Sequence, residues 1–336
     1  MKLAFLLALL LLASCAPRIT GNTTEEHQRL QTTAQERMGI VGHYSDDGFD
    51  PMVFLTTWNF NSLPDEERAK VYRETSLENG RLLREYWITA MDKEIEVAPR
   101  VWFPAWTYNG QVPGPTIRAT EGDTVRIHFR NEGTKPHTIH SHGFHASEMD
   151  GSLPEQFVLP GESFEYEFIA EPFGLHPYHC HSLPIKQHIS KGLYGVYIVD
   201  PKNDTRPKPA KELVMVMNGF DTNFDGGNEV YAVNTKAFYY MMHPIKLKRG
   251  ELVRIHLVNM LEFDLVNSIH THATFFNEYP TGTQLEPERY TDITVLGQAE
   301  RSVLDVRFPF PGKYMFHAHQ AEFSELGWMG FFEVEP

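Results

Sequence analysis

Short runs of alternating hydrophobic and polar residues dominate the chain from about residue 81 onward. Examples are Thr124–Arg130, Phe164–Phe168, Glu251–Val258 and Val303–Phe308. Because successive side chains of a strand point to opposite faces, this period of two predicts strands with one buried face. Gly, Pro, Asn and Asp separate the runs, as they do in turns. Many such strands at short spacing predict an all-β fold of antiparallel sandwiches or barrels.

The chain also repeats itself. The segment Glu121–His128 (EGDTVRIH) is echoed by Arg249–His256 (RGELVRIH), and Pro172–His181 is echoed by Pro309–His319. Two copies of one β-domain account for both echoes. A segment rich in Pro, Lys and Asp, from Asp200 to Lys211, is the expected joint. The predicted domains are residues 81–200 and residues 211–336.

The N-terminus has the pattern of a secretory signal. Its apolar run from Leu3 to Ala13 is eleven residues long, whereas a membrane-spanning helix needs roughly 20, so residues 1–14 are expected to be a signal peptide. The run ends in Leu-Ala-Ser-Cys, which resembles a bacterial lipoprotein processing site with Cys15 acylated. We therefore expect a lipid-anchored protein of the bacterial cell envelope that faces the periplasm or the exterior. A plain secretory signal, in which Cys15 has no role, is the alternative.

Residues 15–80 are polar and irregular, and we expect a tether or N-terminal extension there. One helix is predicted inside it. Ser62 is its expected N-cap, Pro64 lies in the first turn with acidic residues after it, and the helix continues through Ala69–Arg73.

Composition narrows the function classes. The 336 residues include 30 Lys and Arg against 44 Asp and Glu, a net charge of −14, so electrostatic binding to nucleic acid or anionic lipid is not expected. Membrane contact is expected only through the lipid anchor. With Cys15 acylated, Cys180 is the only free thiol of the mature body. The 17 histidines stand out, because twelve of them lie in four short clusters.

Each domain contains one His-x-His pair and then another about forty residues later. On a strand, residues i and i+2 lie on one face, so both imidazoles of a pair can reach the same small site. Neutral imidazole binds Cu, Zn, Ni and Fe, and eight imidazoles exceed the needs of one ion. The pattern therefore predicts a polynuclear metal centre. The pairs are His140 and His142, His179 and His181, His270 and His272, and His317 and His319.

Cys180 predicts a second, different metal site. If His179 and His181 face one way along the strand, Cys180 faces the other way. A thiolate there, together with His137 and His188, gives the Cys-His₂ set of a blue-copper electron-transfer site. The strand would then join the two metal sites by covalent bonds, so an electron can pass from one to the other.

Two further positions refine this second site. Leu193 stands at the axial place commonly held by Met, and an aliphatic side chain cannot coordinate, so we expect a three-coordinate copper with a raised potential. In the second domain Ala318 stands where the thiolate would be needed. One blue-copper site per chain is therefore expected.

Over roughly residues 81–336, the chain resembles multicopper oxidases of the two-domain kind. The resemblance rests on Tyr108–Ile117 (YNGQVPGPTI), on the His-x-x-His-x-His spacing that begins at His137, and on the His-Cys-His at 179–181. It implies two tandem cupredoxin-like Greek-key sandwiches. It also implies a homotrimer, in which each cluster lies between domain one of one copy and domain two of the next.

The resemblance further implies four copper ions per chain. Type 1 copper would be bound by His137, Cys180 and His188, with Leu193 in the non-coordinating axial position. Type 2 copper would be bound by His140 and His270. The two type 3 ions would be bound by His142, His179, His181, His272, His317 and His319. One departure is that seven residues separate Cys180 from His188, and this loop looks more like that of copper nitrite reductases.

The implied reaction is laccase-like: a donor is oxidised one electron at a time, and dioxygen receives four electrons to become water. Protons must also reach the cluster. Asp150 matches the place of a carboxylate that family members use there, and Glu322 or Glu325 is a similar candidate after the fourth histidine cluster. The alternative is that these carboxylates are merely solvated or hold a turn. His145 and His176 are expected to support ligands or to pack, not to coordinate.

Other functions stay open at this stage. A copper nitrite reductase is also a two-domain cupredoxin trimer, but its second centre is a single copper that does not need four complete pairs. A periplasmic copper-binding or electron-transfer protein is the non-enzymatic alternative, although the Met or Cys clusters typical of Cu(I) storage are absent from the sequence. The electron donor stays unassigned among phenols, metal ions and a small redox protein.

Overall fold

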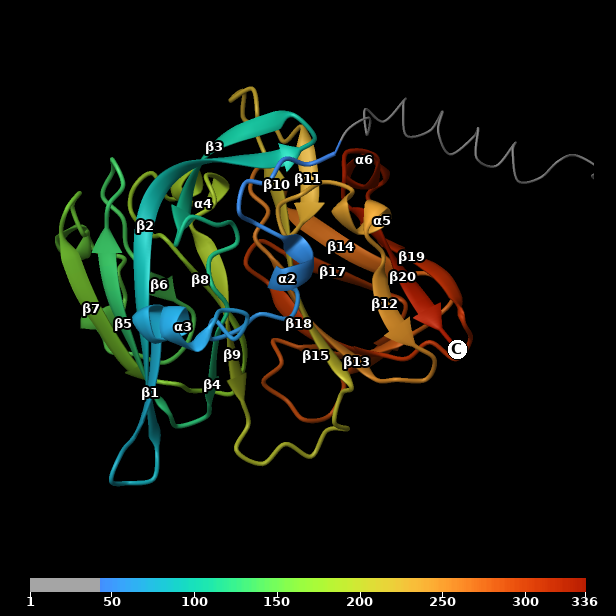
Figure 1. Cartoon of the computed structure of the whole chain (residues 1–336), viewed down its shortest axis with the longest axis horizontal. Coiled ribbons are helices and arrows are strands. Elements are labelled where there is room, and N and C mark those ends of the chain that lie inside the picture. The colour runs from blue at the N-terminus through green and yellow to red at the C-terminus, as the bar shows by residue number, and fades with distance from the viewer. Residues whose placement is uncertain (1–42) are drawn as a thin grey trace, which may run out of the picture. The chain divides into compact units, whose positions relative to one another are not determined.

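The structure is a computed structural model, and it describes residues 43–336. The predicted signal peptide and Cys15 lie outside the described residues. Between residues 43 and 336, no helix is long and apolar enough to cross a membrane. Four sheets make up the described chain, two in each sequence repeat, so the all-β prediction is confirmed (Figure 1).

The first domain has two sheets around one core. Residues of both sheets, such as Tyr86, Ile127 and Tyr178, are fully buried in one cluster. Its strands are β1 (Tyr72–Ser76), β2 (Leu82–Ala98), β3 (Val101–Tyr108), β4 (Ile117–Thr120), β5 (Thr124–Asn131), β6 (His140–Ser141), β7 (Ser163–Ile169), β8 (Gly174–His179) and β9 (Tyr194–Asp200). The first sheet has the order β1-β2-β5-β7, with β3 also paired to β2, and the second has the order β4-β9-β8-β6.

The second domain repeats this plan with its own core, which contains Met215, Ile255 and Phe316. Its strands are β10 (Lys211–Phe220), β11 (Val230–Val233), β12 (Ile245–Lys248), β13 (Val253–Asn259), β14 (Val266–Thr271), β15 (Phe276–Pro280), β16 (Arg289–Thr291), β17 (Ile293–Gly297), β18 (Arg301–Val306), β19 (Gly312–His317) and β20 (Met329–Glu335). Their orders are β11-β10-β13-β18-β15-β16 and β12-β20-β19-β14-β17.

The sequence repeat is a structural repeat. Strands β5 and β13 both follow a glycine turn, in which Gly122 and Gly250 have positive φ angles of 89° and 77°. Each of these strands pairs in parallel with the first long strand of its domain, β5 with β2 and β13 with β10. A left-handed turn favours glycine at this place, which explains why the residue recurs in both copies.

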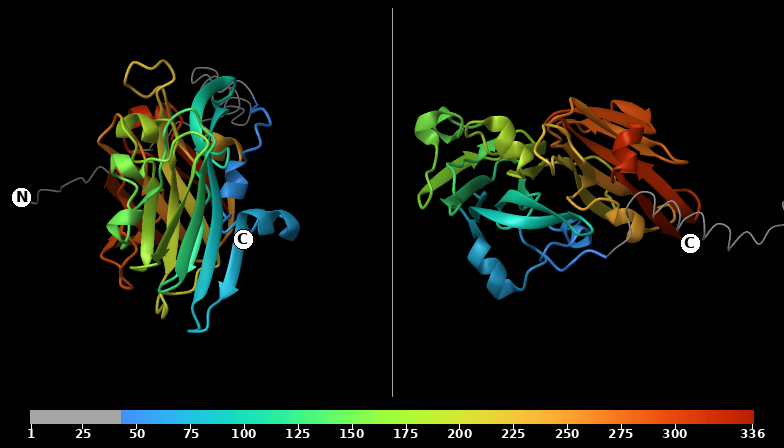
Figure 2. Two further views of the ribbon diagram at one scale, coloured as in Figure 1. Left: turned by 90° about the vertical axis from the view of Figure 1, so that its left-hand side faces the viewer. Right: turned by 90° about the horizontal axis from the view of Figure 1, so that it is seen from above.

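The helices are short (Figure 2). They are α2 (Pro51–Phe54), α3 (Asp65–Val71), η1 (Ser147–Met149), η2 (Pro154–Gln156), α4 (Ile185–Ser190), α5 (Tyr239–Met242) and α6 (Ala321–Glu325). The first two, α2 and α3, precede β1, and the others lie in loops between strands. The helix predicted in the extension is α3, with its acidic residues in the first turn. Its N-cap is Pro64 and not the expected Ser62.

Part of the described extension is packed on the fold. Leu55 is only 1% exposed inside the core of the second domain, and its carbonyl accepts a 2.8 Å bond from Val214 N. Asn59 Nδ2 donates to Arg118 O of the first domain at 2.9 Å. The extension therefore fastens both domains.

A buried ion pair fixes the same segment. Lys236 Nζ lies 2.8 Å from Asp47 Oδ1 and donates to Phe49 O at 2.9 Å. Both charged side chains are 3% exposed. A charge this deeply buried is tolerated only while its partner is present.

We predict that Lys236→Met lowers the free energy of unfolding by about 3 to 5 kcal/mol, because it leaves the Asp47 carboxylate buried and unpaired. Urea denaturation of the two proteins measures the difference. The control is Lys246→Met, since the ion pair of Lys246 with Glu335 spans 3.9 Å and is largely exposed, and such pairs contribute about 0 to 1 kcal/mol. Equal losses in the two variants would contradict the assigned role of the buried pair.

Candidate metal centres

Three buried side chains meet at one end of the first domain. His137 forms an isolated bridge with Val158, Cys180 directly follows β8, and His188 lies in α4. The Nδ1 atoms of the two histidines are 3.2 Å apart. Cys180 Sγ lies 3.2 Å from His188 Nδ1 and 3.9 Å from His137 Nδ1. We call these three residues the Cys180 group.

Burial prepares the Cys180 group for a cation. It lowers the pKa of His137 to about 3, with a smaller contribution from neighbouring His188, and lowers the pKa of His188 to about 4. It also raises the pKa of the Cys180 thiol. The imidazoles therefore stay neutral and offer lone pairs, and a coordinated cation is what turns a buried thiol into a thiolate. One thiolate and two imidazoles fit copper.

Neighbouring residues hold the Cys180 group in place. Thr138 N donates to Cys180 Sγ at 3.3 Å. The ring of Trp106 lies 5.4 Å from the His137 ring and 4.8 Å from the His188 ring. Leu193 is fully buried in the same cluster as Cys180, and its carbonyl accepts a 3.0 Å bond from Cys180 N. Its axial role stays a prediction.

Four histidines of the first domain lie together on the other side of the same segment, and we call them the first histidine set. The Nε2 atoms of His142 and His179 are 3.2 Å apart. The His140 ring is central, because its centroid lies 5.3, 5.1 and 5.0 Å from those of His142, His179 and His181. Strand pairing causes this meeting, since β6 places His140 directly opposite His179 of β8.

The second domain builds an equivalent group, the second histidine set. The Nε2 atoms of His272 and His317 are 3.0 Å apart. The His270 ring is central here, at 5.0, 5.5 and 5.5 Å from the rings of His272, His317 and His319. His270 of β14 lies directly opposite His317 of β19.

The supporting hydrogen bonds of the two sets also match. His179 Nδ1 bonds to Cys180 O, and His317 Nδ1 bonds to Ala318 O. Each bond fixes the proton on Nδ1 and leaves Nε2 free for a metal.

A hydroxyl supports the last histidine of each set. Thr138 Oγ1 accepts a 3.0 Å bond from His181 N, and Ser268 Oγ accepts a 2.8 Å bond from His319 N. Sequence reasoning passed over both hydroxyls. The repeat could have shown them, because each residue stands two positions before the central histidine, in Thr-Ile-His140 and Ser-Ile-His270.

Burial favours the neutral imidazole at five positions of the two sets. Burial lowers the pKa of His142 to about 3, helped by His179, and lowers the pKa of His179 to about 4. Burial also lowers the pKa of His181, His272 and His317. Since imidazole must be deprotonated to bind a metal, these sets are prepared for ligation.

A carboxylate stands behind the central histidine of each set. His140 Nδ1 bonds to Asp150 O at 2.9 Å and lies 3.1 Å from Asp150 Oδ1. His270 Nδ1 bonds to Asp292 O at 2.9 Å and lies 3.8 Å from Asp292 Oδ2. Asp292 was not predicted from the sequence. It follows His270 by 22 residues, whereas Asp150 follows His140 by only 10.

Asp150 is held ionised beside the first set. Burial opposes its ionisation, but the hydroxyl of Ser152 donates to it and the nearby histidines also favour the ionised form, so the pKa of Asp150 is lowered. An ionised carboxylate can hold the proton on His140 Nδ1 and later exchange a proton at the same place.

Among the remaining candidates, the His145 ring lies 6.4 Å from the His140 ring of the first set. Glu322 and Glu325 are exposed on α6, and within residues 43–336 no hydrogen bond or ion pair joins either of them to a histidine. His145 Nε2 bonds to Ser141 O at 2.8 Å, and His176 Nε2 bonds to Pro172 O at 2.9 Å. Both histidines thus serve the backbone near the first set.

Comparison with known proteins identifies the family of this chain. Residues 90–204 and residues 204–336 each match a family model described as multicopper oxidase. A solved multicopper oxidase is 51% identical with a TM-score of 0.81, over 86% of this chain and 98% of that one. The blue copper oxidase of Nitrosomonas europaea is 29% identical with a TM-score of 0.67, over 74% and 85%.

A curated relative points to a second activity within the same fold. The copper-containing nitrite reductase of Neisseria gonorrhoeae is 30% identical over 249 residues, which is 68% of this chain and 62% of that protein. This chain thus spans less than two thirds of that relative. Because both halves of the chain match one family, and a solved member matches over nearly its full length, the chain belongs to the multicopper oxidase family and has its cupredoxin fold.

Proposed function

We propose that this multicopper oxidase couples the one-electron oxidation of a donor to the four-electron reduction of dioxygen to water. The observation that supports this most strongly is the presence of two complete and matching histidine sets. Together they offer eight imidazoles, more than one or two ions require. Bound copper would supply the redox chemistry. The residues of the chain would coordinate the copper ions and transfer protons.

Under this proposal, the Cys180 group and the two histidine sets bind different types of copper. The Cys180 group takes type 1 copper, with Leu193 at the axial position, and the central histidines His140 and His270 take type 2 copper. Four copper ions per chain follow from this assignment. The two type 3 ions are assigned to His142, His179, His181, His272, His317 and His319.

We propose that the two sets meet between copies of the chain. Within residues 43–336 they form separate groups, and His272 and His319 are exposed. Exposed aromatic residues stand next to both sets, with Phe144 69%, Phe275 49% and Tyr290 71% exposed. Exposed apolar surface beside each histidine set supports an interface with another copy at this place. If the first set of each copy contacts the second set of the next, three copies can form a closed head-to-tail ring.

Nitrite reduction is the competing function, supported by the relative from Neisseria and by the loop length between Cys180 and His188. It would use a single copper and three histidines at the second centre. The matching sets would then carry imidazoles without a role. A non-enzymatic copper carrier leaves the same imidazoles unexplained.

We predict four copper ions per chain in the fully loaded protein, a blue absorption band, and oxygen uptake that depends on an added donor. His272→Ala should abolish oxygen uptake and lower the copper count while the blue band stays. Metal analysis, absorption spectroscopy and an oxygen electrode measure these quantities. Two coppers per chain with turnover of nitrite would contradict the proposal.

We predict that Asp150→Asn slows oxygen reduction by about 100-fold, because an amide cannot exchange the proton that the carboxylate holds. The blue band should still bleach when donor is added without oxygen. Stopped-flow absorption separates the two steps. The control is Glu148→Gln, an exposed carboxylate nearby, which should leave both steps unchanged. Full turnover in Asp150→Asn would contradict a role in proton transfer.

We predict that the copper-free protein loses stability as the pH falls from about 6.5 toward 4. His142 and His179 have folded pKa values of about 3 and 4, and in the unfolded chain they bind protons near pH 6.5. The unfolded state therefore binds more protons than the folded state in this range, so the free energy of unfolding decreases as the pH falls. Urea denaturation at pH 7.5 and 5 should show a smaller pH effect for His142→Gln than for the wild type. Equal pH effects in the two proteins would contradict the assigned protonation states.

A further inference from the structure

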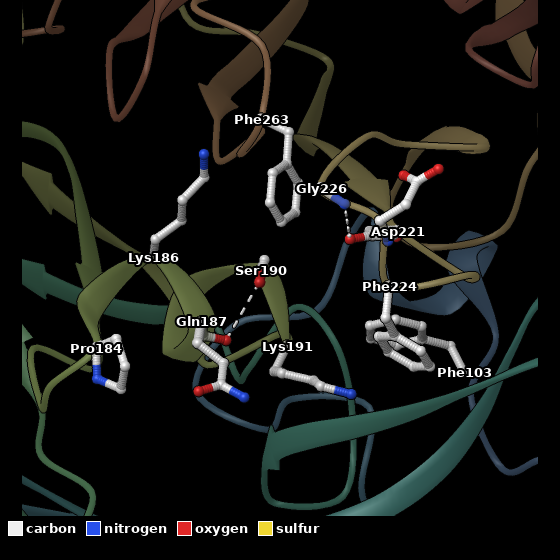
Figure 3. Close-up of a pocket in the computed structure, with 11 residues that line it drawn as sticks. Phe103, Pro184, Lys186, Gln187, Ser190, Lys191, Asp221, Phe224, Gly226 and Phe263 are labelled. Carbon is white, nitrogen blue, oxygen red and sulfur yellow. Dashed lines mark hydrogen bonds between the residues drawn. The ribbon is translucent and has the colours of Figure 1, made fainter.

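A cavity of about 450 Å³ lies beside the helix that carries His188 (Figure 3). Residues of the segment 184–191 form one wall. Strand β3 adds Phe103, and two loops of the second domain add Phe224 and Phe263. The cavity is therefore shared by both domains, and α4 contributes residues to its wall and His188 to the Cys180 group.

The walls combine aromatic faces with two cations. Lys191 Nζ lies 4.4 Å from the centre of the Phe224 ring and 4.8 Å from that of Phe103. Lys186 Nζ lies 4.4 Å from the centre of the Phe263 ring. Figure 3 shows both lysine side chains extended beside these rings. A flat apolar group has surfaces to pack on here, with charged groups at their edges.

The backbone is also unusual at this cavity. Phe224 and Phe263 have positive φ angles of 63° and 73°. Bulky residues rarely adopt this left-handed conformation, and such residues gather at ligand sites. The loops thus hold two phenylalanine rings at the cavity at a conformational cost.

The cations have more hydrogen-bond donors than partners. An ammonium group carries three donors. Lys191 donates one bond, to Pro104 O at 3.0 Å, and neither Lys186 nor Lys191 forms an ion pair with any residue between 43 and 336. The cavity therefore offers N–H groups to a ligand with acceptor oxygens.

Two carboxylates also line the cavity, but their own loop uses them. Asp221 accepts bonds from Asp225 N at 3.1 Å and from Gly226 N at 2.9 Å. Asp225 accepts bonds from Gly227 N at 3.0 Å and from Asn223 Nδ2 at 3.1 Å. Asp221 keeps its charge and acts on Lys191, and Glu262 lies near Lys186. The oxygens of both aspartates are nevertheless engaged by the loop, so the groups that can donate hydrogen bonds to a ligand are the lysine ammonium groups.

The cavity is connected to the Cys180 group by direct contacts. Trp106 N donates to Lys191 O at 2.9 Å, and the Trp106 ring packs on the rings of His188 and His137. His188 lies in the middle of the segment that forms the wall. An electron that leaves a molecule in the cavity has a short path to His188.

We propose that this cavity binds the electron donor and selects a planar aromatic acid, a ring with an oxidisable hydroxyl and an ionised carboxylate or similar anionic group. The inference rests on the proposed oxidase function. The ring packs on the phenylalanine faces, and the anionic oxygens accept bonds from Lys186 and Lys191. Each donor loses one electron through His188 and its hydroxyl proton to solvent, which gives a phenoxyl radical. Four donors balance one dioxygen: 4 ArOH + O₂ → 4 ArO• + 2 H₂O.

Binding is tested first without any turnover, with 4-fluorobenzoate as a redox-inert probe and fluorine NMR titration of the full chain. We expect saturable binding that weakens about tenfold in Lys186→Met and in Lys191→Met, since each removes a charge-assisted hydrogen bond. The neutral probe 4-fluorobenzyl alcohol should bind weakly and equally to all variants. The control is Lys248→Met, an exposed lysine of β12, which should leave both probes unaffected.

Turnover then separates this inference from the proposed function. With 4-hydroxy-3-methoxybenzoate as donor, both lysine variants should raise KM about tenfold at unchanged kcat, whereas 2-methoxyphenol should show no such change. The inference would be overturned if 4-fluorobenzoate bound both lysine variants as tightly as the wild type, or if 4-fluorobenzyl alcohol bound more tightly than 4-fluorobenzoate. Lysine-dependent binding without oxygen uptake would support the site and contradict the proposed oxidase.

Discussion

Successive side chains of an extended strand point to opposite faces, and the separation of the two metal groups depends on this geometry. At residues 179–181 it sends Cys180 toward His137 and His188 and sends the two flanking histidines toward His140. One strand end therefore serves two sites that share no side chain. At residues 317–319 the same geometry acts with alanine in the middle, so the second domain has a histidine set and no thiol.

Burial differs between the two histidine sets. The first domain buries most of its candidate metal ligands, and burial keeps the imidazoles of His137 and His179 neutral. The second domain exposes His272 and His319 at its surface. In the proposed ring, another copy would complete the solvent-facing set. The packed extension contacts both domains of the chain.

Much of this arrangement could be predicted from the sequence, because the relevant information is local. Alternation predicts the strands, and a spacing of two on one strand predicts which imidazoles lie together. Features that depend on distant segments could not be predicted. Asp292 reaches His270 through a longer loop than Asp150 needs, and Leu55 enters the core of the second domain from the opposite end of the chain. Glu322 was chosen because it follows His319, yet α6 leaves it exposed.

In the proposed ring, two histidine sets from different copies form one cluster. The most direct test mixes chains that carry His142→Ala with chains that carry His272→Ala, by co-expression, and measures oxygen uptake. Each variant alone should be inactive. In random rings of the two, about one quarter of the contacts join an intact first set to an intact second set, so the mixture should recover about one quarter of the wild-type rate. A mixture as inactive as its parents, with copper still at the Cys180 group, would contradict the claim.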